Sequence, residues 1–225
     1  KNSEDYLAID ESRMRYVIAD GASDSIFSSL WAKCLVDTFL DMEDLSGDPE
    51  KLMDELCRSS INLWHDEIEW DNLKWNVRNK SVKGSYSTFI GMEIRKSDKN
   101  FRVNCLAVGD SCVFIKTGKR LESFPVKNLT GFGLHPDLIW SGHGEPIYEG
   151  TPLELPDYEM KKYSVESGTR IIMASDAASK WIMEGGSERI EQLFSNFPLE
   201  KEYWDNLRTN GEMKNDDVAV IAVQL

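Results

Sequence analysis

Short apolar stretches alternate with longer segments of helical periodicity in the first third of the chain. Apolar runs at residues 6–10 and 14–19, separated by a polar turn at 11–13, predict a β-hairpin. Apolar positions then recur at helical spacing over residues 26–41. A second segment with the same period follows the helix-start signal Asp48-Pro49 and continues to Ile68. The pattern therefore predicts a hairpin followed by two amphipathic helices.

The middle of the chain is predicted to be mostly β-structure. Residues 70–84 are polar, with asparagines that break any period, and are expected to form a loop. Three strands follow at 85–94, 101–108 and 112–116, and we expect them to pair as an antiparallel meander. Glycines and prolines crowd residues 124–156, which suits a loop-rich insertion over the surface.

The last third returns to strands and helices. Strands are expected at 163–165, 170–175 and 218–225, and helices at 178–183, 188–194 and 201–207. Because strands come in antiparallel runs with helices grouped between them, the fold class is α+β. The strands are apolar on both faces, so the expected architecture is an α/β/β/α sandwich of two antiparallel sheets between helices. We expect residues 1–225 to form one domain.

Composition and charge limit the kinds of molecule that this protein is expected to bind. The formal net charge of −13 argues against a nucleic-acid partner, which needs a basic stripe. The short basic runs at 74–83 and 116–120 are expected to be solvated faces. No segment has the ~20 apolar residues that a membrane span needs. The four cysteines lack metal-ligand or C-x-x-C spacing and are expected to be reduced thiols, which favours a cytoplasmic protein.

Carboxylates stand at the ends of four apolar strands. They are Asp20 after residues 15–19, Asp110 after 103–108, Asp176 after 170–175, and Asp216 before 218–223. An ionised carboxylate beside an apolar strand has a large desolvation cost unless a cation lies next to it. Carboxylate oxygens are the preferred ligands of hard divalent metals, so the pattern predicts a metal site.

In their order along the chain these acidic positions resemble the metal-dependent protein phosphatases of the PPM, or type 2C, family. The matching segments are Glu4-Asp5, Asp20-Gly21, Gly109-Asp110-Ser111, Ser175-Asp176-Ala177 and Asp216-Asp217, with Tyr86-Ser87-Thr88 similar to the family's Gly-Ser-Thr. Each dipeptide alone is a weak signal. Five in the right order, each at a predicted strand end, make a specific one that spans nearly the whole chain.

The resemblance implies a set of metal ligands and a reaction. Asp20 would bridge two Mn or Mg ions, with Glu4 or Asp5 and the Gly21 carbonyl on one ion and Asp176 and Asp216 on the other. Asp110 with Asp176 would match a third, weaker site. The implied reaction is hydrolysis of phosphoserine or phosphothreonine in proteins by a metal-activated water, with Asp20 and Asp176 acting through that water. The expected partner is a phosphoprotein substrate, and the expected state is a monomer.

Departures from the family pattern keep alternatives open. The family's phosphate-binding Arg upstream of the first acids has no counterpart in this sequence, so Lys1 is the candidate for that role. Ala22 and Ala177 also stand where other residues are common in the family. A pseudophosphatase that retains the fold as a binding module, or a phosphatase of small phosphomonoesters, would suit the same residues. Asp20 and Asp176 could instead cap helices, Asp110 could belong to a hairpin turn, and Asp216 could lie in a solvated turn.

Overall fold

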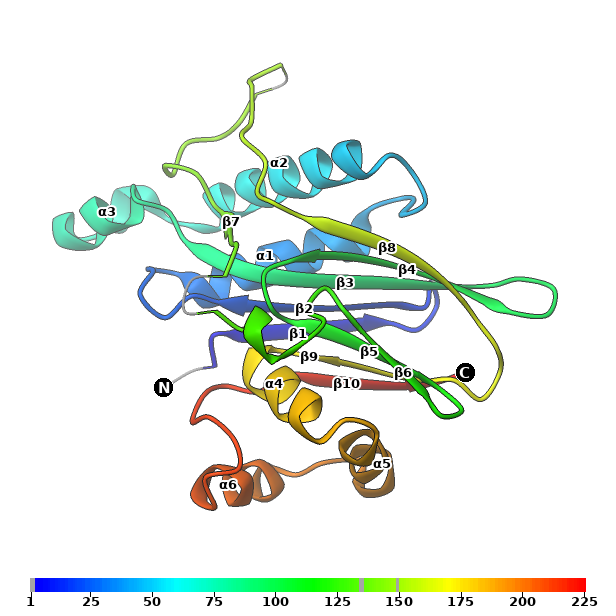
Figure 1. Cartoon of the computed structure of the whole chain (residues 1–225). Helices are drawn as coiled ribbons and strands as arrows, with labels where there is room; N and C mark the ends of the chain where they lie inside the picture. The colour runs from blue at the N-terminus through cyan, green and yellow to red at the C-terminus, as the bar shows by residue number, and fades with distance from the viewer. Residues whose placement is uncertain (1–2, 134–135, 149) are drawn as a thin grey trace.

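Two antiparallel β-sheets form the centre of the molecule, with helices on both outer faces (Figure 1). The computed structural model describes residues 3–133, 136–148 and 150–225. The six-stranded sheet has the order β1(Asp5–Asp10), β2(Arg15–Gly21), β3(Tyr86–Lys96), β4(Phe101–Val108), β8(Glu159–Val165), with β7(Ile139–Trp140) also on β3. The four-stranded sheet has the order β10(Val220–Gln224), β9(Arg170–Ala174), β5(Cys112–Thr117), β6(Arg120–Phe124).

The main core lies between the sheets, because alternate residues of each strand face the opposite sheet. Side chains from both sheets meet there, among them Ile18, Ile90, Cys105, Val113, Ile171 and Ile221. The intervening residues Val17, Ala19 and Phe89 face the helices on the outer side of the six-stranded sheet. This double burial explains why the strands are apolar on both faces, and it confirms the expected α/β/β/α sandwich.

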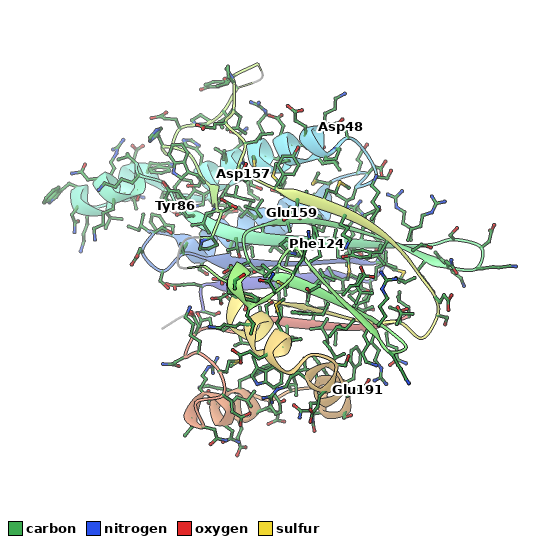
Figure 2. The ribbon with its side chains drawn as sticks, viewed as in Figure 1. Asp48, Tyr86, Phe124, Asp157, Glu159 and Glu191 are labelled. Carbon is green, nitrogen blue, oxygen red and sulfur yellow. The ribbon has the colours of Figure 1, made fainter. Side chains whose placement is uncertain are left out.

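Helices cover the outer faces of the two sheets. α1(Ser28–Asp41) and α2(Pro49–Glu67) pack on the six-stranded sheet. α4(Asp176–Gly185), α5(Ser187–Asn196) and α6(Lys201–Thr209) pack on the four-stranded one. The start signal predicted for α2 is confirmed, since an Asp48 side-chain oxygen accepts from the N–H groups of Glu50 and Lys51, each at 3.1 Å (Figure 2).

The expectation of a loop at 70–84 is wrong. This segment contains the 3-10 turn Trp70–Asn72 and the short helix α3(Trp75–Ser81). Ser81 is the only buried residue of α3, so the helix has no apolar stripe and leaves no helical period in the sequence. Hydrogen bonds hold the segment instead: the Trp70 indole N–H donates to the His65 carbonyl at 2.8 Å, and the Trp140 indole N–H donates to the Lys83 carbonyl at 2.9 Å.

The expected meander is also wrong in its third strand. β3 pairs with β4, but β5 pairs with β6 and β9 in the other sheet. The chain crosses between sheets at Gly109, whose φ of +90° and close neighbours, Asp137 O and the Thr88 side chain, leave no room for a Cβ. A Gly-Asp pair suits a hairpin and a crossover equally well. Asp110 therefore lies in the connection that leads from one sheet to the other, and outside any hairpin turn.

A buried ion pair ties α1 to the sheet. The Arg15 guanidinium donates to a Glu93 carboxylate oxygen at 3.0 and 3.1 Å, and the two side chains are 1% and 3% exposed. The same guanidinium donates to backbone carbonyls at the end of α1 and just after it, namely those of Leu40, Met42 and Glu43. The five-donor fork of Arg is thus used to fix where α1 ends on β2 and β3.

All four cysteines, Cys34, Cys57, Cys105 and Cys112, are free and buried. Burial raises the pKa of each thiol to about 12, so these side chains act as small apolar groups. Within the part of the chain that the structure describes, none of the helices combines the length and apolar character that crossing a bilayer requires.

Candidate metal centre

Acidic residues from four separate segments meet at one end of the sandwich. Asp20 ends β2, Asp110 lies in the crossover from β4 to β5, Asp176 begins α4, and Asp216 precedes β10. All four line one open cavity of about 890 Å³. In Figure 1 the start of α4, the segment before β10 and the end of β2 lie at the same edge of the molecule. The structure thus brings together four of the predicted strand-end acids.

Asp5 and Asp20 lie next to each other, because they are paired positions in the β1–β2 ladder, and Asp20 lines the cavity. Burial, followed by the nearby charges of Asp5 and Asp176, raises the pKa of Asp20 to about 9. Burial also raises the pKa of Asp5 to about 6, although hydrogen bonds with Asp20 and Ser175 oppose the increase. Burial and mutual repulsion therefore favour the protonated form of this pair over the doubly ionised one.

One carboxylate oxygen of Asp5 indicates that this site binds a ligand. Its Oδ2 atom is buried and has no hydrogen-bond partner in the structure. Buried carboxylate oxygens are normally paired, so an unpaired one that faces a second acid points to a cation. An all-oxygen set formed by Asp5, Asp20 and the Gly21 carbonyl suits a hard divalent ion. The residues present therefore fit the implied Mn or Mg.

Gly21 must be a glycine at this position. A Cβ there would come within 2.7 Å of the Ser28 carbonyl oxygen and 3.0 Å of the Glu4 carbonyl oxygen. The Gly21 N–H donates to that Glu4 carbonyl at 3.2 Å. Of the two N-terminal acids, Asp5 is the one opposite Asp20, whereas the Glu4 side chain accepts a hydrogen bond from Ser23 and its N–H donates to Asp217 at 2.9 Å.

Lys214 lies between Asp176 and Asp216. Its ammonium nitrogen is 2.6 Å from an Asp216 carboxylate oxygen and 3.3 Å from one of Asp176. These contacts raise the pKa of Lys214, so the side chain stays charged. The two carboxylates expected on the second metal ion are therefore held by a lysine, which our sequence analysis did not single out.

Asp110 is 5% exposed and lies near the same group. Burial, and then the charge of Asp176, raise the pKa of Asp110 to about 6, while Lys214 opposes the increase. The acid is thus electrostatically linked to Asp176, the residue with which the resemblance groups it.

The helix-cap interpretations of Asp20 and Asp176 are not supported. The N-cap position of α1 is Phe27, seven residues beyond Asp20, and that of α4 is Ser175. Ser175 makes no cap hydrogen bond, and its hydroxyl instead accepts from the Ala219 N–H at 3.0 Å. Asp216 stays in a turn, but the turn faces the cavity.

No three Asp, Glu, His or Cys side chains in residues 3–133, 136–148 and 150–225 already form a metal-holding group. Carboxylates repel one another without a cation between them, and in this site Lys214 lies between Asp176 and Asp216. Lys1, the candidate phosphate-binding residue, and His135 lie outside the described residues. His65 stacks on Trp70 and His143 packs edge-on against Trp140, and neither is among the described residues that line the cavity.

Three lysines also line the cavity, namely Lys80, Lys83 and Lys214. The sequence had not indicated that any of them belongs to the site. Lys80 and Lys83 belong to the basic run at 74–83, which was expected to be a solvated face. Its position beside the acids depends on α3, and the sequence gives no period that would reveal this helix. The local excess of positive charge was the only available signal.

Comparison with solved structures places the fold. PppA, described as a key regulatory component of T6SS in Pseudomonas aeruginosa, is 18% identical with a TM-score of 0.62, covering 100% of this chain and 92% of that one. The Mycobacterium tuberculosis serine/threonine phosphatase PstP/Ppp is 16% identical with a TM-score of 0.63, at the same coverage. The catalytic domain of PstP in complex with two manganese ions is 16% identical with a TM-score of 0.60, covering 99% and 91%.

These similarities extend over essentially the whole length of both chains. No protein-family profile matches the sequence, and a comparison with curated proteins found no relative. The chain therefore has the fold of the PP2C-type serine/threonine phosphatases, as the order of its acidic segments predicted, with a sequence far from those of the solved examples.

Proposed function

We propose that residues 1–225 form one domain that hydrolyses phosphoserine or phosphothreonine in proteins with the help of Mn or Mg. The observation that carries this proposal is the pair of facing acids Asp5 and Asp20, the first with a buried and unpaired oxygen, beside a cavity that Asp20 lines together with Asp110, Asp176 and Asp216. A buried carboxylate oxygen without a partner is rare in a structural core and is typical of a ligand site. The similarity in fold to serine/threonine phosphatases, one of them bound to two manganese ions, supports the same assignment.

The chain's own residues divide into two groups of ligands. Asp5 and the Gly21 carbonyl, with Asp20, would hold one ion, and Asp20 with Asp176 and Asp216 would hold the other, while Asp110 would add to Asp176. When bound, two such ions would activate a water and neutralise the phosphoryl oxygens, so no protein nucleophile would be needed. Glu4 remains a candidate for an indirect part through its N–H bond to Asp217.

Neighbouring hydroxyls fix the ligands before any ion binds. The Ser87 hydroxyl donates to the Asp20 carbonyl at 2.9 Å, which holds the end of β2 against β3. The hydroxyl of Thr88, which lines the cavity, is hydrogen-bonded at 3.0 Å to the hydroxyl of Ser111, the residue after Asp110. Such a shell lets the acids keep their positions despite mutual repulsion, as a preorganised site requires.

The proposal is tested by hydrolysis assays. With millimolar Mn²⁺ the protein should hydrolyse p-nitrophenyl phosphate and a phosphothreonine peptide, and Asp20→Asn or Asp176→Asn should each reduce kcat at least about 100-fold. Asp24→Asn, an exposed acid at the same cavity, is the control and should keep activity. A folded preparation with no activity at millimolar Mn²⁺ would refute the hydrolase.

A second function, a pseudophosphatase that binds phosphoproteins without hydrolysis, is favoured by one observation. Lys214 already neutralises Asp176 and Asp216, and an internal cation can replace a metal structurally without activating water. Calorimetric titration separates the two functions. Binding of two Mn²⁺ ions supports the enzyme, whereas no binding at millimolar Mn²⁺ supports the binding module.

The proposed setting is the cytoplasm, with a phosphoprotein as partner. Four free, buried thiols suit a reducing compartment. A serine/threonine phosphatase needs only transient contact with its substrate, which an open cavity of this size allows.

A further inference from the structure

The basic segment around α3 forms one wall of the acidic cavity. Residues 72–92 contain Lys74, Arg78, Lys80 and Lys83 and no acid, in a chain with 39 acidic and 26 basic residues. All four side chains are exposed, and none pairs with an acid in the part of the chain that the structure describes. Lys80 and Lys83 line the same cavity as Asp20 and Asp176. The cavity thus has an acidic floor and a basic wall.

This wall is held in place by the backbone around Lys83. The Trp140 indole N–H donates to the Lys83 carbonyl at 2.9 Å, and His143 Nδ1 lies 3.1 Å from the Val82 carbonyl oxygen. Gly84, at φ +77°, packs so tightly on Trp140 that a Cβ would collide with its ring nitrogen. Lys83 is therefore presented from a fixed position.

The same segment is bonded to the strand end that carries Asp20. The Ala22 N–H donates to the Tyr86 carbonyl at 2.8 Å, and the Tyr86 N–H donates to the Ser25 hydroxyl at 3.3 Å. Tyr86 lies where β3 begins, at the α3 end of the sheet (Figure 2). Its ring is stacked on that of Trp140. Because β2 and the segment from Lys83 to Tyr86 share these bonds, the spacing between acids and lysines is set by the fold.

We propose that Lys80 and Lys83 bind negative charge that flanks the phosphorylated residue, so that the site selects phosphorylated segments with adjacent acidic side chains. The inference deepens the proposed function and rests on it for the phosphorylated residue. A protein of net charge −13 repels acidic peptides, and unpaired lysines at the cavity offset this where the substrate enters. Exposed Tyr86, 39% accessible, offers a surface for the peptide backbone between the two charges. Two lysines are too few for a nucleic-acid track.

The test compares two phosphothreonine peptides that differ only in having Glu or Gln beside the phosphothreonine. Binding of fluorescein-labelled peptides is measured by fluorescence anisotropy at low salt in metal-free buffer, so that it does not depend on turnover. The variant is Lys80→Gln/Lys83→Gln. Its matched control, Lys96→Gln/Lys99→Gln, removes the same charge from exposed lysines at the opposite end of β3, in the β3–β4 hairpin (Figure 1).

The wild-type protein should bind the Glu peptide about 5- to 30-fold more tightly than the Gln peptide. This preference should fall to within about 2-fold in Lys80→Gln/Lys83→Gln and persist in Lys96→Gln/Lys99→Gln. Three results would overturn the inference: no preference in the wild type, a preference that survives in Lys80→Gln/Lys83→Gln, or equal loss in both variants.

Hydrolysis of p-nitrophenyl phosphate, which is too small to span the cavity, is measured in parallel with Mn²⁺. If the small substrate is hydrolysed but the peptides are not distinguished, the inference fails and the phosphatase stands. If the peptides are distinguished in binding but nothing is hydrolysed, the phosphatase fails and the lysines still select acidic partners.

Discussion

Asp20 is the residue on which the electrostatics of the site depend. Its pKa of about 9 and the pKa of about 6 for Asp5 and Asp110 all exceed the ordinary value of 3.8. The folded protein therefore binds more protons than the unfolded chain between those limits. Such groups contribute stability that is complete below the unfolded pKa and is lost as the pH rises through the folded pKa.

The stability of the metal-free protein should consequently fall as the pH rises from about 5 to about 9. Urea unfolding in EDTA measures this, and saturating Mn²⁺ should remove most of the decline because the ions neutralise the same carboxylates. Asp20→Asn, which cannot ionise, should flatten the metal-free curve and stabilise the protein near pH 8 by about 1–3 kcal/mol. Metal-free stability that increases over this range would contradict the assignment of buried, repelling acids.

Lys214 is the other decisive residue, because its ammonium group competes with any cation for Asp176 and Asp216. Lys214→Met should tighten Mn²⁺ binding about 5- to 10-fold in calorimetry, since a partly exposed ion pair is worth little and is lost when the metal binds. The matched control is Lys99→Met, an exposed lysine outside the cavity, which should leave the affinity unchanged. Unchanged or weaker affinity in Lys214→Met would show that the lysine helps to build the metal site.

Some helices and strands of this fold could be predicted from the sequence pattern, and others could not. The hairpin of β1 and β2, the helices α1 and α2, and the doubly apolar strands were predictable because each leaves a period of 2 or 3.6, or a continuous apolar run. α3 left no period because only Ser81 is buried. The crossing of β5 to the second sheet was not predictable, since the Gly109-Asp110 turn looks the same in a hairpin and strand pairing is decided by distant partners.

The Arg15–Glu93 pair should contribute to stability by holding the end of α1 on the sheet. Arg15→Met should destabilise the protein by about 3 kcal/mol in urea unfolding, because a buried carboxylate loses its main partner and the carbonyls at the end of α1 lose their donor. Arg15→Met/Glu93→Gln should recover part of the loss, as removing both charges leaves no buried ion. A double variant less stable than the sum of the single changes would contradict this explanation.

At the scale of the whole molecule, the candidate site combines acids that the sequence revealed with lysines that it did not. The acids were predictable because each stands at the end of an apolar strand and five segments follow a known order. Lys80, Lys83 and Lys214 come from a short exposed helix, its following turn and a loop, where no motif marks them and only the fold brings them to the cavity. The protein therefore has a local cluster of lysines at the cavity although its formal net charge is −13.

In the proposed site, acids from separate segments of the chain jointly hold a pair of cations. Anomalous diffraction from crystals soaked in Mn²⁺ would locate these ions. We predict two manganese peaks in the cavity, both in contact with Asp20, one also with Asp5 and the other with Asp176 and Asp216, with Lys214 displaced from between the last two. A cavity without manganese peaks, with Lys214 still paired to both carboxylates in well-ordered crystals, would contradict it.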